Sequence, residues 1–355
     1  MIHSHEYWMR RCLVLARKAL GQTSPNPMVG SIVLDAQGHK VGEGFHQKAG
    51  NEHAETFSLR QAGAKAKGGT LYVNLEPCSI VNKQPPCSKN IIRHDLQRVV
   101  FGCKDSNPLI SGNGIQELKE HGIEVIQCLE KETQQFNQVF FHWIQKKCPF
   151  VRCKVALSKN YKMGVQGKRT QISDPLLEKT TMKLRAQSDA ILIGVETAMC
   201  DNPKLNVRGK YADRQPVRII IDPSLRIDQK LQLFSIPGKI ILVCDQQKVS
   251  KEKIQNFQSD QIEVLPLVSK EGTIQFQDIL PALAKKEIAS VLLEGGRKTL
   301  EQAHKEQVVD QWVMYQSAVA LESQQSIPFD LPNWDWKIFE RVQKVKSDQI
   351  VTYQK

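Results

Sequence analysis

The chain has 355 residues, which at the usual ~150 residues per domain suggests about two domains. Apolar residues make up 41% of it and charged residues 24%, an ordinary globular balance that excludes a disordered or fibrous chain, and no run reaches the ~20 consecutive apolar residues of a membrane span. Lysine and arginine exceed aspartate and glutamate by 49 − 37 = 12, a surplus that favours an anionic ligand such as a sugar phosphate.

The first part of the chain alternates helix-like and strand-like segments. It starts without the apolar core of a secretory signal, so we expect a cytoplasmic protein. The predicted helices are His5–Leu20, His53–Gln61, Ser88–His94, Gly114–His121 and Glu132–Lys147. The predicted strands are Val29–Leu34, Lys40–Phe45, Thr70–Leu75, Val99–Gly102 and Ile123–Gln127. This order indicates an α/β sandwich over residues 1–147.

A second domain is predicted over residues 148–355, because Pro149 is a natural break after the preceding helix. Its predicted strands are Phe150–Leu157, Ala190–Gly194, Val217–Ile221, Lys239–Val243 and Ser290–Leu293. Its predicted helices are Asp174–Ala186, Asp278–Lys286 and Arg297–Lys305. Strands that alternate with helices indicate a largely parallel sheet with helices on both faces. The last ~35 residues, with Trp334, Trp336 and Phe339, are expected to form closing strands.

One imidazole and two thiols form the strongest chemical signal. His53 opens a predicted helix, and Cys78 and Cys87 flank the start of another. A histidine and two cysteines suit tetrahedral zinc with a fourth position open for water. Zinc lowers the pKa of a bound water towards neutrality. Glu55, two residues after the histidine, is placed to accept the proton of that water.

The arrangement His-x-Glu, Pro-Cys and Cys is the signature of nucleobase deaminases. The surplus of positive charge leaves a nucleic-acid-editing deaminase open as an alternative, although the sequence has no evident stretch of interleaved aromatic and basic residues. A closed structural zinc site in a binding module is a second alternative, in which Glu55 would have no function.

Further motifs occur in a fixed order around this signature. They are Asn26-Pro27-Met28-Val29-Gly30, Gly42-x-Gly44-x-His46, Gly50-x-x-His53-Ala54-Glu55, Leu75-Glu76-Pro77-Cys78-Ser79, Pro85-Pro86-Cys87 and Asp105-x-Asn107-Pro108. With these motifs the chain closely resembles the bifunctional deaminase–reductases of riboflavin biosynthesis. The resemblance implies a cytidine-deaminase-like α/β/α sandwich followed by a dihydrofolate-reductase-like α/β domain.

The resemblance also implies an activity for the first domain. It implies the zinc-dependent hydrolytic deamination of 2,5-diamino-6-ribosylamino-4(3H)-pyrimidinone 5′-phosphate, with Glu55 as the catalytic residue and His53, Cys78 and Cys87 as the metal ligands. Asn26, His46 and Lys83 would contact this substrate, with Lys83 as a phosphate partner.

For the second domain, the resemblance implies reduction of the ribosyl group to ribityl by NADPH. Arg185, Leu205, Arg208 and Glu294 would bind the substrate, and Thr197, Asp201, Gly295 and Gly296 would bind the cofactor. A Gly-Gly turn between a strand and a helix also suits a phosphate on physical grounds, because its backbone N–H groups can approach closely.

The second domain departs from the family pattern at several positions. The usual Ser-Leu-Asp-Gly-Lys run reads Ser158-Lys159-Asn160-Tyr161-Lys162, the position of Glu196 is usually small, and Arg169 and Gln171 replace a serine and a tryptophan. The usual glycines are absent from Ser317–Glu322. These departures leave open a deaminase whose second domain serves structure or dimerisation. For both alternatives we expect a small phosphorylated pyrimidine as the ligand, no nucleic acid or membrane partner, and a homo-oligomer.

Overall fold

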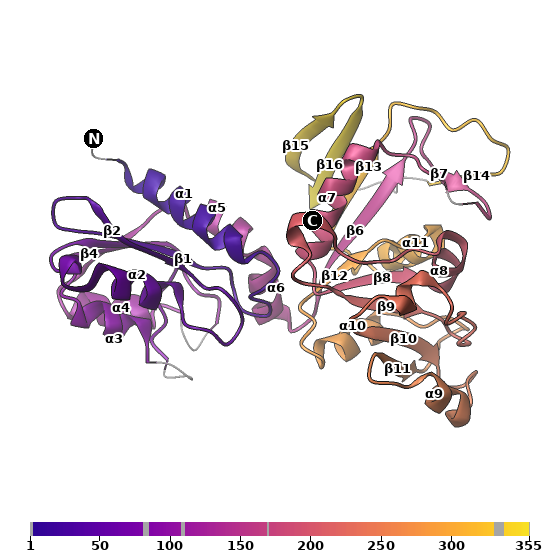
Figure 1. Ribbon diagram of the computed structural model, residues 1–355, viewed down its shortest axis with the longest axis horizontal. Coiled ribbons are helices and arrows are strands. Elements are labelled where there is room, and N and C mark those ends of the chain that lie inside the picture. The colour runs from indigo at the N-terminus through magenta and orange to yellow at the C-terminus, as the bar shows by residue number, and fades with distance from the viewer. Residues whose placement is uncertain (1–2, 81–84, 108–110, 169, 330–336, 355) are drawn as a thin grey trace. The chain divides into compact units, whose positions relative to one another are not determined.

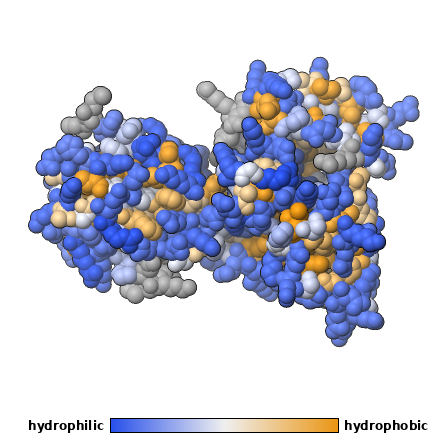
Figure 2. All heavy atoms as spheres, viewed as in Figure 1, coloured by the Kyte–Doolittle hydropathy of each residue, from blue (hydrophilic) through white to orange (hydrophobic). Residues whose placement is uncertain are grey.

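The computed structural model describes residues 3–80, 85–107, 111–168, 170–329 and 337–354. The chain divides into two compact units, Met1–Lys147 and Cys148–Lys355 (Figure 1). Among the described residues, no helix is long and apolar enough to cross a membrane. Figure 2 shows mostly hydrophilic residues on the visible face, with hydrophobic residues scattered between them.

The first unit is built on a five-stranded sheet in the order β2-β1-β3-β4-β5. Its strands are β1 (Gly30–Leu34), β2 (Lys40–Phe45), β3 (Thr70–Leu75), β4 (Arg98–Cys103) and β5 (Glu124–Gln127). Its helices are α1 (His5–Ala16), α2 (Ala54–Ala62), α3 (Cys87–Arg93), α4 (Asn113–Glu120), α5 (Glu130–Phe136) and α6 (Gln138–Lys146). Strands β3, β4 and β5 are parallel, and β1 is antiparallel to both of its neighbours.

Alternating side chains divide this sheet into two buried faces. Ile32 and Tyr72 pack with Met9 of α1 on one face, whereas Val33 packs with Leu59 of α2 on the other face. Successive residues of a strand point to opposite sides, so a strand that is buried throughout, such as β1, needs a helix on each face. The deaminase-like sandwich expected from the sequence is present.

The second unit contains a nine-stranded sheet in the order β11-β10-β9-β8-β12-β6-β13-β16-β15, and a two-stranded sheet of β7 and β14. The strands are β6 (Phe150–Leu157), β7 (Lys162–Val165), β8 (Ala190–Gly194), β9 (Val217–Ile221), β10 (Ile240–Asp245), β11 (Ile262–Leu267), β12 (Ser290–Leu293), β13 (Gln311–Gln316), β14 (Ser326–Pro328), β15 (Lys337–Val345) and β16 (Asp348–Gln354). The helices are α7 (Glu178–Ala186), α8 (Val195–Asp201), α9 (Lys251–Phe257), α10 (Phe276–Ala284) and α11 (Arg297–Lys305).

The large sheet is parallel from β11 to β13 and ends in an antiparallel β16–β15 edge. Leu192 of β8 packs with residues of α10 and α11, whereas its neighbour Ile191 packs on the opposite face with residues of α8. The parallel sheet therefore has helices on both faces, as predicted. Because the strands run in one direction, loops from β8, β9 and β12 meet at one edge of the sheet.

Several predicted elements were wrong in extent. The single helix expected over Glu132–Lys147 is two helices, α5 and α6, interrupted at Asn137. The helix expected from His5 ends at Ala16 and continues as a 3₁₀ turn, and the one expected from Asp174 begins as a 3₁₀ turn at Pro175. Strand β11 was not predicted, because Pro266 lowers its strand propensity, although a proline is tolerated at the sheet edge. Strands β7 and β13 and helices α8 and α9 were not predicted either.

Candidate functional site

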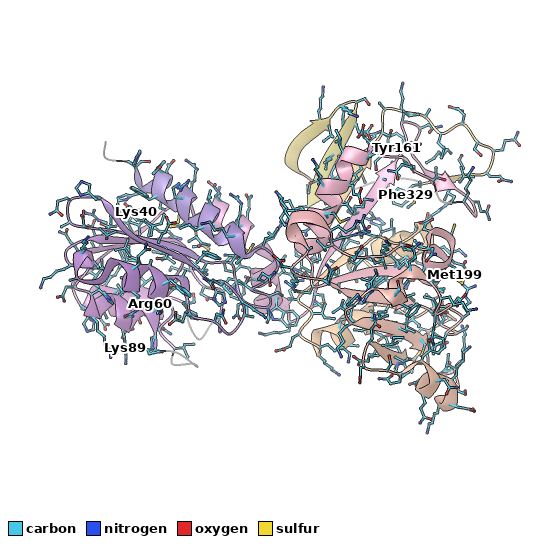
Figure 3. All side chains as sticks on the ribbon, in the orientation of Figure 1. Lys40, Arg60, Lys89, Tyr161, Met199 and Phe329 are labelled. Atoms are coloured by element: carbon cyan, nitrogen blue, oxygen red, sulfur yellow. The ribbon has the colours of Figure 1, made fainter. Side chains whose placement is uncertain are left out.

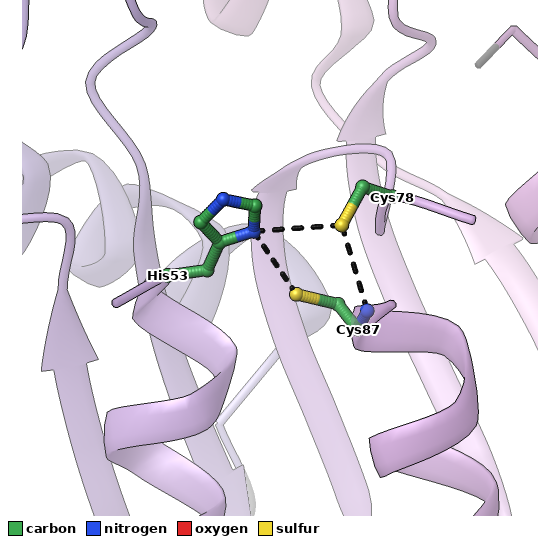
Figure 4. Close-up of side chains that lie close together, drawn as sticks. All are labelled: His53, Cys78 and Cys87. Carbon is green, nitrogen blue, oxygen red and sulfur yellow. Dashed lines mark hydrogen bonds between the residues drawn. The ribbon is translucent and has the colours of Figure 1, made fainter. Parts of the chain in front are cut away.

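Three side chains from different elements converge in the first unit (Figure 4). His53 caps the start of α2, Cys78 follows β3, and Cys87 is the first residue of α3. The Nδ1 atom of His53 lies 3.2 Å from Sγ of Cys87 and 3.4 Å from Sγ of Cys78. All three ligand atoms lie within 4.8 Å of one another. Among the described residues, they are the cluster of histidine, cysteine or acidic side chains close enough together to hold a metal ion.

These distances fit a tetrahedral zinc ion. Zinc–nitrogen and zinc–sulfur bonds of about 2.1 and 2.3 Å place two tetrahedral ligand atoms about 3.6 Å apart. The three atoms can therefore reach one ion with little movement. Since the set contains only three ligands, a fourth position stays open, as expected for a catalytic rather than a structural site.

The surroundings of the Cys78 sulfur stabilise its thiolate form. A hydrogen bond with Cys87 and the nearby His53 lower the pKa of the Cys78 thiol to about 4. The same cluster acts on the imidazole, since contact with Cys78 raises the pKa of His53 to about 9. The backbone N–H of Cys87, at the start of α3, also lies 3.5 Å from Sγ of Cys78. A soft anionic donor is thus available for a cation.

Glu55 lies within the first turn of α2, and its side chain is buried. Burial raises the pKa of its carboxyl group, while the charge of His53 opposes that increase. Its carboxylate also contacts Cys87. A carboxyl group with a raised pKa beside a metal site can take up a proton and release it again.

Asn26 and His46 lie beside this group. Nδ2 of Asn26 is 3.5 Å from Nε2 of His46, whose Nδ1 is 3.0 Å from the backbone oxygen of Glu52. The His46 and His53 rings meet edge to face, with centroids 5.9 Å apart. The structure therefore brings both predicted substrate residues to the metal ligands. Lys83, the third predicted substrate residue, lies outside the described residues.

Two asparagines that the sequence analysis did not identify fix the segment next to Asn26. Asn74 accepts the N–H of Gly30 at 2.7 Å and donates to the backbone oxygen of Met28 at 3.0 Å. Asn137 accepts the N–H of Met28 at 3.0 Å and donates to the same backbone oxygen at 3.1 Å. Asn74 could have been found from the sequence, because it is a polar residue inside the otherwise apolar strand Leu71–Leu75.

Glu76 was also missed, although it adjoins the Pro77-Cys78 motif. Its side chain is 3% exposed, and Oε2 accepts the N–H groups of Asp105 and Gly112 at 3.2 and 3.1 Å. A Cβ atom at Gly114 would lie 2.0 Å from the Pro77 oxygen. Glu76 and Gly114 therefore hold the residues before Cys78 against the segment that leads into α4.

In the second unit, a small cluster of glycines and threonines lies where β8 and β12 end. The N–H of Gly296 donates to Oγ1 of Thr197 at 3.0 Å. A Cβ atom at Gly295 would lie 2.8 Å from the Thr299 side chain, and one at Gly296 would lie 2.8 Å from Thr197. Glycine is thus required for this close approach of α8 and α11, and a helix start beside a Gly-Gly turn suits the phosphates of a dinucleotide.

Arg185 and Glu294 form a buried ion pair beside this cluster. Nε of Arg185 lies 2.7 Å from Oε1 of Glu294, its Nη2 lies 3.0 Å from Oε2, and its Nη1 donates to the Asn206 oxygen at 3.0 Å. Lys154, which the sequence analysis did not assign to the site, contributes a second positive charge near Glu294 and lies 5.0 Å from the Tyr315 ring centroid. The guanidinium of Arg185 is therefore bonded within the protein, and its expected contact with the substrate stays a prediction.

The remaining predicted site residues of the second unit, Asp201, Leu205 and Arg208, lie close together in the sequence but differ in their exposure to solvent. Leu205 is 2% exposed and packs in the core, so only its main chain can contact a ligand. Arg208 is exposed and pairs with Glu178 and with Asn206 Oδ1. Asp201 ends α8, which begins two residues before Thr197.

The loop between β6 and β7 accommodates its departures from the family pattern. Tyr161 stands at the usual glycine position and takes a φ of +57°, while its backbone oxygen accepts the N–H of Phe329 at 3.1 Å (Figure 3). Asn160 accepts the N–H of Leu321 at 3.0 Å and donates to its oxygen at 3.3 Å. The left-handed turn is therefore retained without glycine. Arg169 lies outside the described residues.

Family models match both units. The cytidine and deoxycytidylate deaminase zinc-binding region matches residues 2–103, and the RibD C-terminal domain matches residues 149–351. Among curated proteins, the riboflavin biosynthesis protein RibD of Aquifex aeolicus is 37% identical over 310 residues, covering 87% of this chain and 85% of that protein. The Escherichia coli RibD protein is 33% identical, with 87% and 86% of the two chains covered.

Solved structures agree with these matches. A diaminohydroxyphosphoribosylaminopyrimidine deaminase/5-amino-6-(5-phosphoribosylamino)uracil reductase from Thermotoga maritima superposes with a TM-score of 0.87 at 31% identity and covers 99% of this chain and 98% of that one. RibD from Acinetobacter baumannii gives a TM-score of 0.84 at 29% identity with the same coverage.

Proposed function

This chain belongs to the RibD family of bifunctional deaminase–reductases of riboflavin biosynthesis, and we propose which of its residues carry out each step. It is a zinc-dependent pyrimidine deaminase with an NADPH-dependent reductase in the same chain. The two-activity interpretation is supported over a deaminase with a purely structural second domain, because the relatives align across both units.

We assign the deamination to the cluster around His53. His53, Cys78 and Cys87 hold the zinc ion, which when bound supplies a Lewis acid that lowers the pKa of water. Glu55 accepts a proton from the attacking water at its carboxylate and returns it to the amino group that leaves as ammonia. The observation that carries this assignment is the convergence of three ligand atoms within 4.8 Å beside a buried carboxyl group.

Asn26 and His46 orient the pyrimidine at this site. The ring nitrogen of His46 that is not bonded to the Glu52 oxygen faces Asn26, so the two side chains offer adjacent polar groups to a base. Asn74 and Asn137 act through the main chain of Met28 and hold Asn26 in place. Lys83 is proposed as a phosphate partner on the resemblance alone.

We assign the reduction to the edge formed by β8 and β12. Thr197, Asp201, Gly295 and Gly296 hold the cofactor, and NADPH when bound supplies the hydride that converts the ribosyl group to ribityl. Glu294 contacts the substrate, and Arg185 keeps that carboxylate ionised, because the adjacent guanidinium lowers its pKa against the effect of burial. Arg208 and the main chain of Leu205 contribute further substrate contacts.

The ligand is a small phosphorylated pyrimidine, namely 2,5-diamino-6-ribosylamino-4(3H)-pyrimidinone 5′-phosphate in the first reaction and its deaminated product in the second. A homo-oligomeric assembly in the cytoplasm, without nucleic acid or membrane partners, completes the proposal.

The experiment is to supply the purified full chain with the diamino substrate and to measure ammonia release, and separately to supply the deaminated product with NADPH and follow the nicotinamide absorbance. We expect both signals. Ammonia release without NADPH oxidation would support the structural-domain alternative. Conversion of cytosine in a single-stranded oligonucleotide, with no activity on the nucleotide, would support the editing alternative.

A further inference from the structure

The turn after β9 directs one arginine outward at the edge where the cofactor is proposed to bind. Asp222 is fully buried, and its Oδ2 accepts the N–H of Ile227 at 2.9 Å. Leu225 and Ile227 are 1% and 3% exposed and pack in the core. The side chain between them, Arg226, is 49% exposed and projects away from the core.

The guanidinium of Arg226 pairs with the carboxylate of Glu196 on α8. Glu196 directly precedes Thr197, whose hydroxyl accepts the N–H of Gly296. Figure 1 shows α8 and α11 next to each other at this end of the sheet. The ion pair therefore adjoins the glycine turn to which we assign the phosphates of the cofactor.

We propose that Arg226 recognises the phosphate on the adenosine ribose that distinguishes NADPH from NADH, and that Glu196 competes with this phosphate for the guanidinium. The inference rests on the reductase function proposed above. A guanidinium binds phosphate through two parallel hydrogen bonds, and a phosphate dianion attracts it more strongly than one carboxylate does.

The exposure of the pair supports exchange of one partner for another. The side chains of Arg226 and Glu196 are 49% and 69% exposed, and ion pairs this accessible to water are weakly held. The carboxylate of Glu196 adds a negative charge beside the proposed phosphate site. This negative charge weakens phosphate binding until the phosphate displaces the Glu196 carboxylate from Arg226.

The lysines near this turn are engaged elsewhere. Nζ of Lys253 donates to the Ser224 oxygen at 2.9 Å, and Nζ of Lys248 lies 3.6 Å from the buried Asp245 carboxylate. Among the described residues of this turn, Arg226 is the cation that pairs with a solvent-exposed side chain, that of Glu196. It is therefore the group best placed to exchange a carboxylate for a phosphate.

The test is calorimetric titration of the full chain with adenosine 2′,5′-bisphosphate and with adenosine 5′-monophosphate, which lacks the 2′-phosphate. R226M should weaken the bisphosphate by about 10- to 100-fold and change the monophosphate by less than about twofold. E196Q should tighten binding of the bisphosphate by about two- to fivefold. K286M is the matched control, because it also removes one positive charge from an ion pair, with Glu263, near the opposite ends of the strands. It should change neither affinity.

Equal weakening of both probes in R226M would overturn the assignment of Arg226, and an unchanged or weaker bisphosphate affinity in E196Q would overturn the competition. A wild-type chain that binds both probes equally while it oxidises NADPH refutes this inference and leaves the reductase function intact. A wild-type chain that neither binds the probes nor oxidises NADPH refutes the reductase function itself. The KM values for NADPH and NADH of the variants should change in the same ratio as the two probes.

Discussion

Substitution of Glu55 by glutamine tests the proton transfer directly. Glutamine keeps the volume and one acceptor oxygen of the buried side chain but cannot take up a proton at neutral pH. Two other buried carboxylates near the site, Glu76 and Asp105, bind backbone N–H groups and are not placed to substitute. Loss of a general acid–base group typically costs about 10²- to 10⁴-fold in rate, which corresponds to about 3–5 kcal/mol of activation free energy.

The assay compares ammonia release, zinc content and NADPH oxidation in one preparation of E55Q. We expect kcat for ammonia release to fall in that range, zinc to stay at the wild-type stoichiometry because Glu55 is not one of the three ligands, and NADPH oxidation with the deaminated substrate to remain unchanged. E55D, which keeps the acid but shortens the side chain, should retain part of the activity. Full zinc occupancy with kcat within tenfold of wild type would refute the assignment of Glu55.

Three further predictions concern stability. R185M should lower the free energy of unfolding of the second unit by about 3 kcal/mol in urea, because it leaves Glu294 buried without its bidentate partner. The double variant R185M/E294Q should recover part of this loss. Equal destabilisation by the single and the double variant would contradict the ion-pair argument. G114A should cost about 2 kcal/mol or more and lower zinc affinity by direct titration, since its Cβ would collide with the Pro77 oxygen next to a ligand. A backbone N–H and a lysine lower the pKa of Asp174, so its contribution to folding stability is present above the ordinary aspartate pKa and is lost as the pH falls through the lowered value. D174N should therefore flatten the dependence of the melting temperature on pH in this acidic range. An unchanged slope would contradict this prediction.

The metal site could be predicted from the sequence because all three ligands belong to short motifs, and two of them lie at helix starts. His53 caps α2 and Cys87 begins α3, so their positions depend on local structure together with strand ends of a parallel sheet. The sequence did not reveal the contacts of Asn137 with Met28, because they join residues far apart in the chain and leave no periodic signal.

The reductase edge was harder to predict for the same reason. Arg185 was expected to bind the substrate, but its partner Glu294 lies more than a hundred positions later, and only the fold shows that the two meet. Tyr161 departs from the family pattern, yet the structure shows the tyrosine in the left-handed region that a glycine would occupy. This departure therefore leaves the turn intact.

The two hydrogen bonds between the Asn137 side chain and the Met28 main chain also determine how short an independently active first unit could be. The zinc-binding family model ends at residue 103, and a truncation there would retain every metal ligand and Glu55. Such a fragment would nevertheless release the main chain beside Asn26 from one of its two asparagine anchors. Protein engineers who want the deamination step alone should therefore keep the chain at least through the break between α5 and α6.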